Sequence, residues 1–255
     1  MPGDERAPEL DPRGTQLDAA DAERLLAGGN IEILGLMPRS SNYTFLAKVV
    51  PERPEDPEVL AIYKPRRGEQ PLWDFPDGTL ANREVAAFRV ATQLGWPFVP
   101  PTVLRDGPEG PGSVQLFLEF DPQQHFFTLF DHHESEFRQV AVFDAIANNA
   151  DRKGGHTLLA HDGRVFVIDH GVCFNAAPKL RTVIWEFEGE PIEADLLADL
   201  ERLRASLDAG SLGRDLAALL TREEIDATLR RTGELLASKV FPSPGDELPY
   251  PWPAI

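Results

Sequence analysis

DAIANNADRKGGHTLLAHDGRVFVIDHGVCF, residues Asp144 to Phe174, is the stretch from which the fold of this chain can be predicted. Two short apolar runs lie on either side of an Asp162-Gly163 turn, and Asp-Gly between apolar runs predicts a β-hairpin. A hairpin would bring Asp151 and His156, which precede it, close to Asp169, which follows it. Clustered carboxylate oxygens suit Mg²⁺ and phosphate chemistry. A surface hairpin with acidic loops is the competing interpretation, because loops are commonly rich in Asp, Asn and Gly.

The charge of the whole chain argues against two classes of partner. The 255 residues include 25 Lys and Arg against 42 Asp and Glu, which gives a net charge of −17. This balance opposes binding to nucleic acid or to an anionic membrane surface. We therefore expect no nucleic-acid partner.

Cysteine content and hydrophobicity narrow the class of protein further. Cys173 is the single cysteine, so an intrachain disulfide is excluded and a cysteine-based zinc site is not expected. The sequence contains no apolar run of about 18 residues, so we expect no membrane span. The first residues, MPGDERAPELDPRG, lack the basic and apolar regions of a signal peptide. These features predict a cytoplasmic protein.

The N-terminal half reads as an antiparallel meander followed by a helix. The expected strands are Ile31–Met37, Tyr43–Val50, Val59–Lys64 and Val114–Phe120. A turn at 40–42 separates the first two strands, and a long connection, 65–78, leads from Lys64 into a helix at Gly78–Leu94. We expect an extended segment at 96–104 and a turn at 106–112, where Gly and Pro cluster.

The C-terminal half is predicted to be mostly helical. Helical periodicity is present at 135–148, 193–207, 212–220 and 223–240. The predicted organisation is a disordered lead-in, an N-terminal lobe, a C-terminal lobe and a proline-rich tail, with boundaries at 1–15, 16–120, 121–240 and 241–255.

The order of these elements and the motif DAIANNADR…H…VIDHGVCF resemble the protein-kinase-like superfamily. In particular they resemble its phosphatidylinositol 3-/4-kinase and HipA-like branch and the small actinobacterial proteins related to those kinases. The resemblance covers roughly residues 30–240. It implies an α+β, two-lobed protein-kinase-like fold, with an N-terminal antiparallel sheet and one helix above a mostly helical C-terminal lobe. It also implies ATP and Mg²⁺ as cofactors.

The resemblance assigns roles to five residues of the predicted site. Lys64 is similar to the strand lysine that holds the α- and β-phosphates, and Glu84 to the helix carboxylate that fixes this lysine. Asp151 is similar to the aspartate that accepts the proton of the attacking hydroxyl, and Arg152 follows it and braces the loop. Asp169 is similar to the aspartate that chelates Mg²⁺ across the phosphates.

Further residues are assigned by position. Glu119 and Phe120 fall where a hinge contacts adenine, and Ser40, Ser41 and Asn42 fall where a turn covers the phosphates. His156 occupies the place of the family's second metal ligand, which is usually Asn. Imidazole is a poor ligand for Mg²⁺, so His156 is interpreted either as a ligand of Mn²⁺ or as a residue that only packs the loop.

The predicted function is ATP-dependent phosphotransfer to a hydroxyl of a soluble small molecule or a protein, by a kinase of the phosphatidylinositol 3-/4-kinase-like group. A lipid headgroup is less expected, because only Lys179 and Arg181 are basic in the segment after Asp169. The alternatives are a nucleotide-binding pseudokinase or regulatory module, an enzyme that transfers AMP to a protein, and a structural domain.

Overall fold

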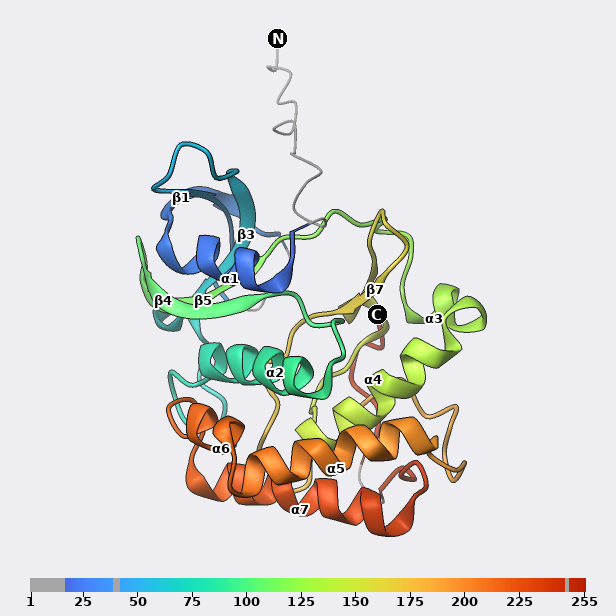
Figure 1. The fold of residues 1–255 in the computed structure, drawn as a ribbon. Coiled ribbons are helices and arrows are strands. Elements are labelled where there is room, and N and C mark those ends of the chain that lie inside the picture. Colours follow the sequence, from blue (N-terminus) through green and yellow to red (C-terminus); the bar gives the residue numbers. More distant parts are fainter. Residues whose placement is uncertain (1–16, 39–41, 246–247) are drawn as a thin grey trace.

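A β-sheet forms one end of the molecule and a group of helices forms the other (Figure 1). The computed structural model describes residues 17–38, 42–245 and 248–255. The predicted lead-in at 1–15 and two residues of the predicted phosphate turn, Ser40 and Ser41, lie outside the described residues.

The sheet is antiparallel and has the strand order β1-β2-β3-β5-β4. Its strands are β1 (Asn30–Leu36), β2 (Phe45–Val50), β3 (Val59–Pro65), β4 (Thr102–Gly107) and β5 (Gly110–Leu116). The predicted meander of the first three strands is confirmed by the pairing of β1 with β2 and of β2 with β3. Helix α1 (Ala19–Gly28) contacts β4 and β5 and begins at Asp18, whose side chain caps the helix.

The segment predicted as an extended run and a turn is instead a hairpin. β4 pairs with β5 from Thr102 to Gly107, so most of the predicted turn at 106–112 is strand. Gly112 explains the difference, because a Cβ there would lie 2.4 Å from the carbonyl oxygen of Lys64. Glycine at this position lets β5 approach β3 closely. The predicted strand at 114–120 correspondingly ends at Leu116.

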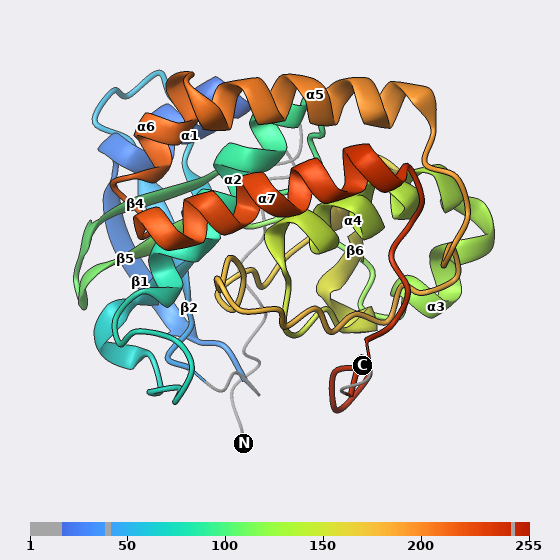
Figure 2. The same ribbon diagram turned by 90° about the horizontal axis from the view of Figure 1, so that it is seen from below.

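The helices gather below the sheet (Figure 1). They are α2 (Leu80–Leu94), α3 (Phe126–Leu129), α4 (Glu134–Ala147), α5 (Ala194–Asp208), α6 (Ser211–Leu216) and α7 (Arg222–Ser238). α2 lies between the two ends of the molecule and contacts β4 and β5 as well as α5 and α6. From below, α5, α6 and α7 cover much of the molecule (Figure 2). The predicted α+β architecture, an antiparallel sheet at one end and mostly helices at the other, is confirmed, and the lobe boundaries at 120 and 240 stay predictions.

α2 is held to the helical lobe by a buried ion pair. Arg83 Nη2 lies 2.5 Å from Glu224 Oε1 of α7, and its Nη1 donates a hydrogen bond to the carbonyl of Cys173 at 2.7 Å. Arg83 is almost completely buried. Since breaking a buried pair leaves an uncompensated charge, this contact fixes α2 relative to α7.

The predicted hairpin of the central stretch is confirmed. β6 (Thr157–Leu159) pairs with β7 (Val165–Val167), and the amide of Ile168 extends the pairing by donating to the carbonyl of His156 at 3.0 Å. α4 leads into this stretch and ends at Asn148, which adopts a left-handed conformation with φ 52°. Asparagine tolerates that conformation, so the chain turns sharply into the loop before the hairpin.

The last described residues lie against this loop. The carbonyl of Pro249 accepts from the amide of Thr182 and from Trp185 Nε1, and the carbonyl of Ala254 accepts from the amide of Gly154 at 2.7 Å. These contacts pack the proline-rich tail against the body of the molecule at Pro249 and Ala254. Among the residues that the structure describes, no helix has both the length and the apolar character needed to cross a membrane.

Candidate active site

Lys64 reaches the site from the sheet. β3 alternates between buried and partly exposed residues, and Tyr63 and Pro65 on either side of Lys64 are buried. The lysine therefore points away from the core that the sheet forms with α1 and into a cavity. Its Nζ lies 2.6 Å from Glu84 Oε1 of α2 and 2.5 Å from Asp169 Oδ1. Burial acts to lower the pKa of Lys64, but these two carboxylates outweigh it and raise the pKa above its usual range.

Asp169 lies at the end of the hairpin in an unusual backbone conformation. Its φ of 60° is left-handed, and such conformations in non-glycine residues are often found at functional sites. The side chain is half-exposed, and its Oδ2 lies 3.4 Å from His156 Nε2. Burial acts to raise the pKa of Asp169, but the positive charge of Lys64 holds it well below its usual range. Asp169 is therefore an anion in this site.

Asp151 is positioned by the asparagine that precedes it. The amide of Asp151 donates to Asn149 Oδ1 at 3.0 Å, and buried Asn149 in turn donates to Asp144 Oδ1. The Asp151 carboxylate lies 3.2 Å from Lys153 Nζ. Burial raises the pKa of Asp151, while the nearby charge of Lys153 acts in the opposite direction. A raised pKa brings a carboxylate closer to the range that suits a general base.

Arg152 is buried and faces away from the cavity. Its guanidinium forms an ion pair with Asp144 at 3.0 Å and donates to the carbonyl of Ile168 at 2.8 Å. These contacts join the loop that carries Asp151 to the strand end that carries Asp169. A fully buried side chain has no access to a substrate, so we propose that Arg152, predicted with the catalytic residues, positions the loop.

His156 contacts the backbone of Lys153 with one ring nitrogen and faces Asp169 with the other. The amide of Lys153 donates to His156 Nδ1 at 3.4 Å, so in the neutral ring the proton is on Nε2, facing Asp169. Burial lowers the pKa of His156 to about 4. The ring is therefore neutral at pH 7. In this arrangement His156 orients the loop, and its role as a metal ligand stays a prediction.

Of the other residues predicted to contact nucleotide, Asn42 lines the cavity, whereas Glu119 and Phe120 do not. Asn42 lines the same cavity as Lys64, and its Oδ1 accepts from the amide of Gln70 at 2.8 Å. Glu119 and Phe120 do not line this cavity among the described residues. Phe120 instead forms an isolated antiparallel bridge with Ala160 in the hairpin, so it connects the two ends of the molecule.

The charged residues of the site line one cavity of about 260 Å³. Six of the predicted residues line it: Asn42, Lys64, Glu84, Asp151, His156 and Asp169. Fixed charges in a shaped cavity can stabilise the charge that develops on a transferring group without reorganising. The arrangement suits a phosphorylated ligand with a divalent cation.

Two charged residues of this cavity were not among the predicted site residues. Lys153 lies beside Asp151, and the DRK sequence directly after Asn149-Ala150 was the available signal. Glu69 accepts from the amides of Leu80 and Ala81 at 3.1 and 2.9 Å and so caps the start of α2. Because Glu69 lies eleven residues before Leu80, no local sequence pattern predicts that it caps α2.

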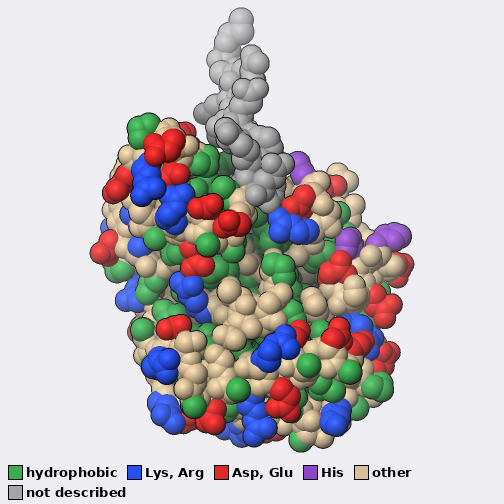
Figure 3. Space-filling view, in the orientation of Figure 1, with side chains coloured by type: hydrophobic (Ala, Val, Ile, Leu, Met, Phe, Trp, Pro, Cys, Tyr) green, Lys and Arg blue, Asp and Glu red, His purple; other side chains and the backbone are tan. Residues whose placement is uncertain are grey.

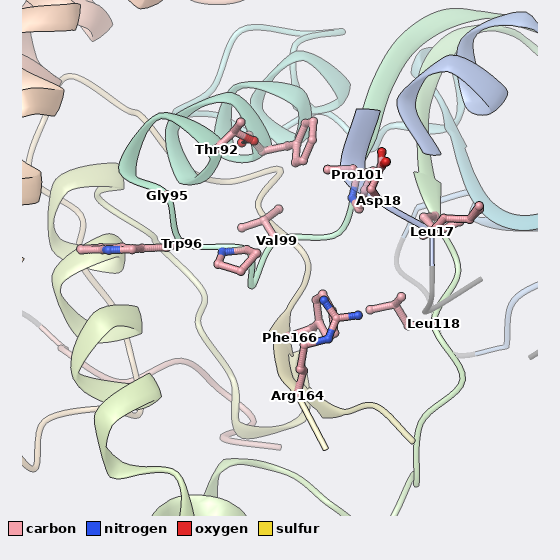
Figure 4. A pocket seen from close by; sticks show the side chains of 14 residues that line it. Leu17, Asp18, Thr92, Gly95, Trp96, Val99, Pro101, Leu118, Arg164 and Phe166 are labelled. Atoms are coloured by element: carbon pink, nitrogen blue, oxygen red, sulfur yellow. Dashed lines mark hydrogen bonds between the residues drawn. The ribbon is translucent and has the colours of Figure 1, made fainter. Parts of the chain in front are cut away.

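A second cavity of about 270 Å³ lies elsewhere, beyond the C-terminal end of α2 (Figure 4). Trp96, Val99, Leu118 and Phe166 make its lining largely apolar. Lys64, Asp151 and Asp169 are not among the residues that line this second cavity. It is therefore separate from the candidate active site.

The side chains near Asp169 supply oxygen ligands for a divalent cation such as Mg²⁺ or Mn²⁺. No cluster of three His, Cys, Asp or Glu ligands is found in residues 17–38, 42–245 and 248–255. Mg²⁺ in phosphate-transfer sites is usually bound by one or two carboxylates together with substrate phosphates. Asp169 and Asp151 line one cavity and supply such carboxylates, so the site fits a cation that a nucleotide helps to hold.

The sequence has a curated relative. It is 39% identical to Protein Rv2133c of Mycobacterium tuberculosis over 269 residues, an alignment that covers 92% of this chain and 95% of that protein. The chain belongs to the Rv2133c family. No family model matches the sequence.

Solved structures, among them those of a kinase, share the fold. The Golgi casein kinase aligns with a TM-score of 0.53 at 14% identity, over 86% of this chain and 74% of that one. Hydra Fam20 with sugar aligns with a TM-score of 0.51 at 15% identity, over 90% of this chain and 91% of that one. The Golgi casein kinase with Mn/ADP bound gives a TM-score of 0.50 at 14% identity, over 86% and 75%. The chain therefore has an atypical protein-kinase-like fold.

Proposed function

We propose that this protein is an ATP-dependent kinase that phosphorylates a hydroxyl of a soluble small molecule or of a protein. The observation that carries this proposal is that Lys64 Nζ contacts both Glu84 and Asp169 in the cavity that Asp151 also lines. Support comes from structural relatives that are kinases by name, one of them with Mn/ADP bound. The finer assignment to the phosphatidylinositol 3-/4-kinase-related group is part of the proposal.

Each charged residue of the cavity has a separate role in the proposed phosphate transfer. Lys64, held by Glu84, neutralises the phosphates of ATP. Asp151 accepts a hydrogen bond from the acceptor hydroxyl, orients it toward the γ-phosphorus and takes its proton. Lys153 stabilises negative charge on the transferred phosphoryl group. Asp169 would hold Mg²⁺ or Mn²⁺, which supplies further charge neutralisation at the phosphates.

Surface charge favours a soluble acceptor over a lipid headgroup. On the face shown in Figure 3, acidic and basic side chains of the described residues are interspersed, without a broad basic area that would suit an anionic membrane. The net charge of −17 acts in the same direction.

Thermal unfolding with ATP, with and without Mg²⁺ or Mn²⁺, tests the nucleotide site. A ligand that binds the folded state raises Tm by mass action, so we expect a metal-dependent rise. Mass analysis of the products then separates phosphate transfer from AMP transfer. The absence of any shift with every nucleotide and metal would overturn the proposal.

His156 favours a second candidate, a nucleotide-binding pseudokinase or regulatory module. The imidazole replaces an oxygen ligand and carries its proton toward Asp169. This candidate predicts nucleotide binding without turnover in the wild type. It also predicts that His156→Asn, which supplies an amide oxygen, strengthens binding with Mg²⁺ more than binding with Mn²⁺.

A further inference from the structure

His170 lies between the catalytic loop and α2, and the mechanism above does not use it. The ring is completely buried and packs edge-on against Phe143, with ring centroids 5.6 Å apart. Its Nε2 lies 2.8 Å from Arg152 Nη2, and its backbone amide donates to Glu84 Oε2 at 3.0 Å. One residue therefore contacts both the buried arginine of the loop and the carboxylate that holds Lys64.

These contacts fix the position of the ring proton. A guanidinium can only donate hydrogen bonds, so Nε2 of His170 accepts from Arg152 and the neutral ring carries its proton on Nδ1. Burial, together with the positive charge of Arg152, holds the pKa of His170 well below its usual range, in agreement with a neutral ring.

The proton on Nδ1 has no acceptor within hydrogen-bond distance among the described residues. The nearest carboxylate oxygen, Glu84 Oε2, is 4.0 Å away. A buried donor without a partner costs free energy, and a small rotation of the Glu84 carboxylate would remove that cost. Glu84 is held on its other oxygen by Lys64, which is itself drawn toward Asp169.

We propose that His170 is a positioning residue that donates from Nδ1 to Glu84 Oε2 when nucleotide is bound. The inference rests on the proposed kinase function. Phosphates in the cavity compete with Asp169 for Lys64, and the resulting shift of Lys64 lets the Glu84 carboxylate, which stays bound to Lys64 through Oε1, rotate its Oε2 toward the His170 ring. The histidine then transmits the rigid position of Arg152 to Glu84 and, through it, to Lys64.

Three substitutions separate this role from simple packing. His170→Phe keeps an aromatic ring against Phe143 but removes both nitrogens. His170→Asn retains an amide donor near the position of Nδ1, and His170→Gln places an amide near the position of Nε2. We expect His170→Phe to lower ATP affinity and kcat/KM by about 10- to 100-fold, as supporting residues at such sites do. His170→Asn should recover more of the ATP affinity than His170→Gln.

NMR of ¹⁵N-histidine-labelled protein gives a readout that packing alone would not move. In the free protein we expect the His170 proton on Nδ1, and with ATP and Mg²⁺ its resonance should shift downfield as the hydrogen bond forms. A proton on Nε2, or equal ATP affinity and kcat/KM in wild type, His170→Phe and His170→Asn, would overturn the inference. A wild-type protein that does not bind ATP would instead overturn the proposed function. If His170→Phe does not fold, His170→Asn and the NMR measurement still decide.

Discussion

Lys64 Nζ lies 2.5 Å from Asp169 Oδ1, so the two residues proposed to handle phosphate and metal neutralise each other in the free protein. A metal–nucleotide complex must separate them, because phosphate and cation compete for the same charges. Until ligand arrives, Lys64 thus lies between two carboxylates, those of Glu84 and Asp169.

Replacement of Lys64 tests this relationship. Lys64→Ala leaves Glu84 and Asp169 facing each other without a cation, so we expect a lower Tm and a loss of ATP affinity of about tenfold or more. Thermal unfolding and ATP titration measure both effects. Lys48→Ala is the matched control, since Lys48 lies on β2 and pairs at the surface with Glu32 and Glu58. Equal ATP affinity in the two variants would contradict the assignment of Lys64.

Asp151 is expected to act in turnover and not in binding. Asp151→Asn removes the proton acceptor while keeping the shape of the side chain, so kcat should fall by about 10²- to 10⁴-fold with little change in ATP affinity. Steady-state kinetics and ATP titration measure the two quantities. Asp162→Asn, in the hairpin turn where Asp162 pairs with Arg164, is the control and should retain full activity. Unchanged kcat in Asp151→Asn would remove it from the proposed mechanism.

The depressed pKa of His156 predicts an acid-sensitive fold. The usual pKa of histidine is 6.5, and the folded protein holds that of His156 at about 4. Between these values the unfolded chain binds more protons than the folded one, so stability falls as pH drops from 6.5 toward 4. Tm measured across this range should fall less in His156→Asn than in wild type. Equal pH dependence of Tm in His156→Asn and wild type would contradict this account of His156.

The ion pair of Arg152 with Asp144 is expected to be a main determinant of stability in the catalytic loop. Both side chains are fully buried, so Arg152→Met should lower the free energy of unfolding by about 3–5 kcal/mol, as unpaired buried charges do. Denaturant titration measures this loss. Arg222→Met, which breaks an exposed pair with Asp226, should cost only about 0.3–0.5 kcal/mol. A cost in Arg152→Met as small as in the control would show that the loop does not depend on this pair.

Local signals in the sequence were sufficient for much of the fold. Asp162-Gly163 predicts the β6–β7 hairpin, and this hairpin brings His156 beside Asp169. Periodicity located α2, and with it Glu84. The contact of Glu84 with Lys64 was expected from the resemblance, and the structure brings the two side chains together.

Other features depend on contacts that no local pattern carries. The β4–β5 hairpin depends on the close approach of Gly112 to the backbone of Lys64, which lies 48 positions earlier in the chain. The same holds for the contact of His170 with Glu84, 86 residues apart. Such long-range relationships appear only when the sheet and the hairpin have been brought together.

The anchoring of α2 by Arg83 restricts how this protein can be controlled. Its ion pair with Glu224 fastens the helix that bears Glu84 to α7, so an outward swing of α2 would strip a buried charge of its counterion. We therefore expect no inactive form created by displacement of this helix. Release of α2 from α7 would require a new buried partner for Arg83.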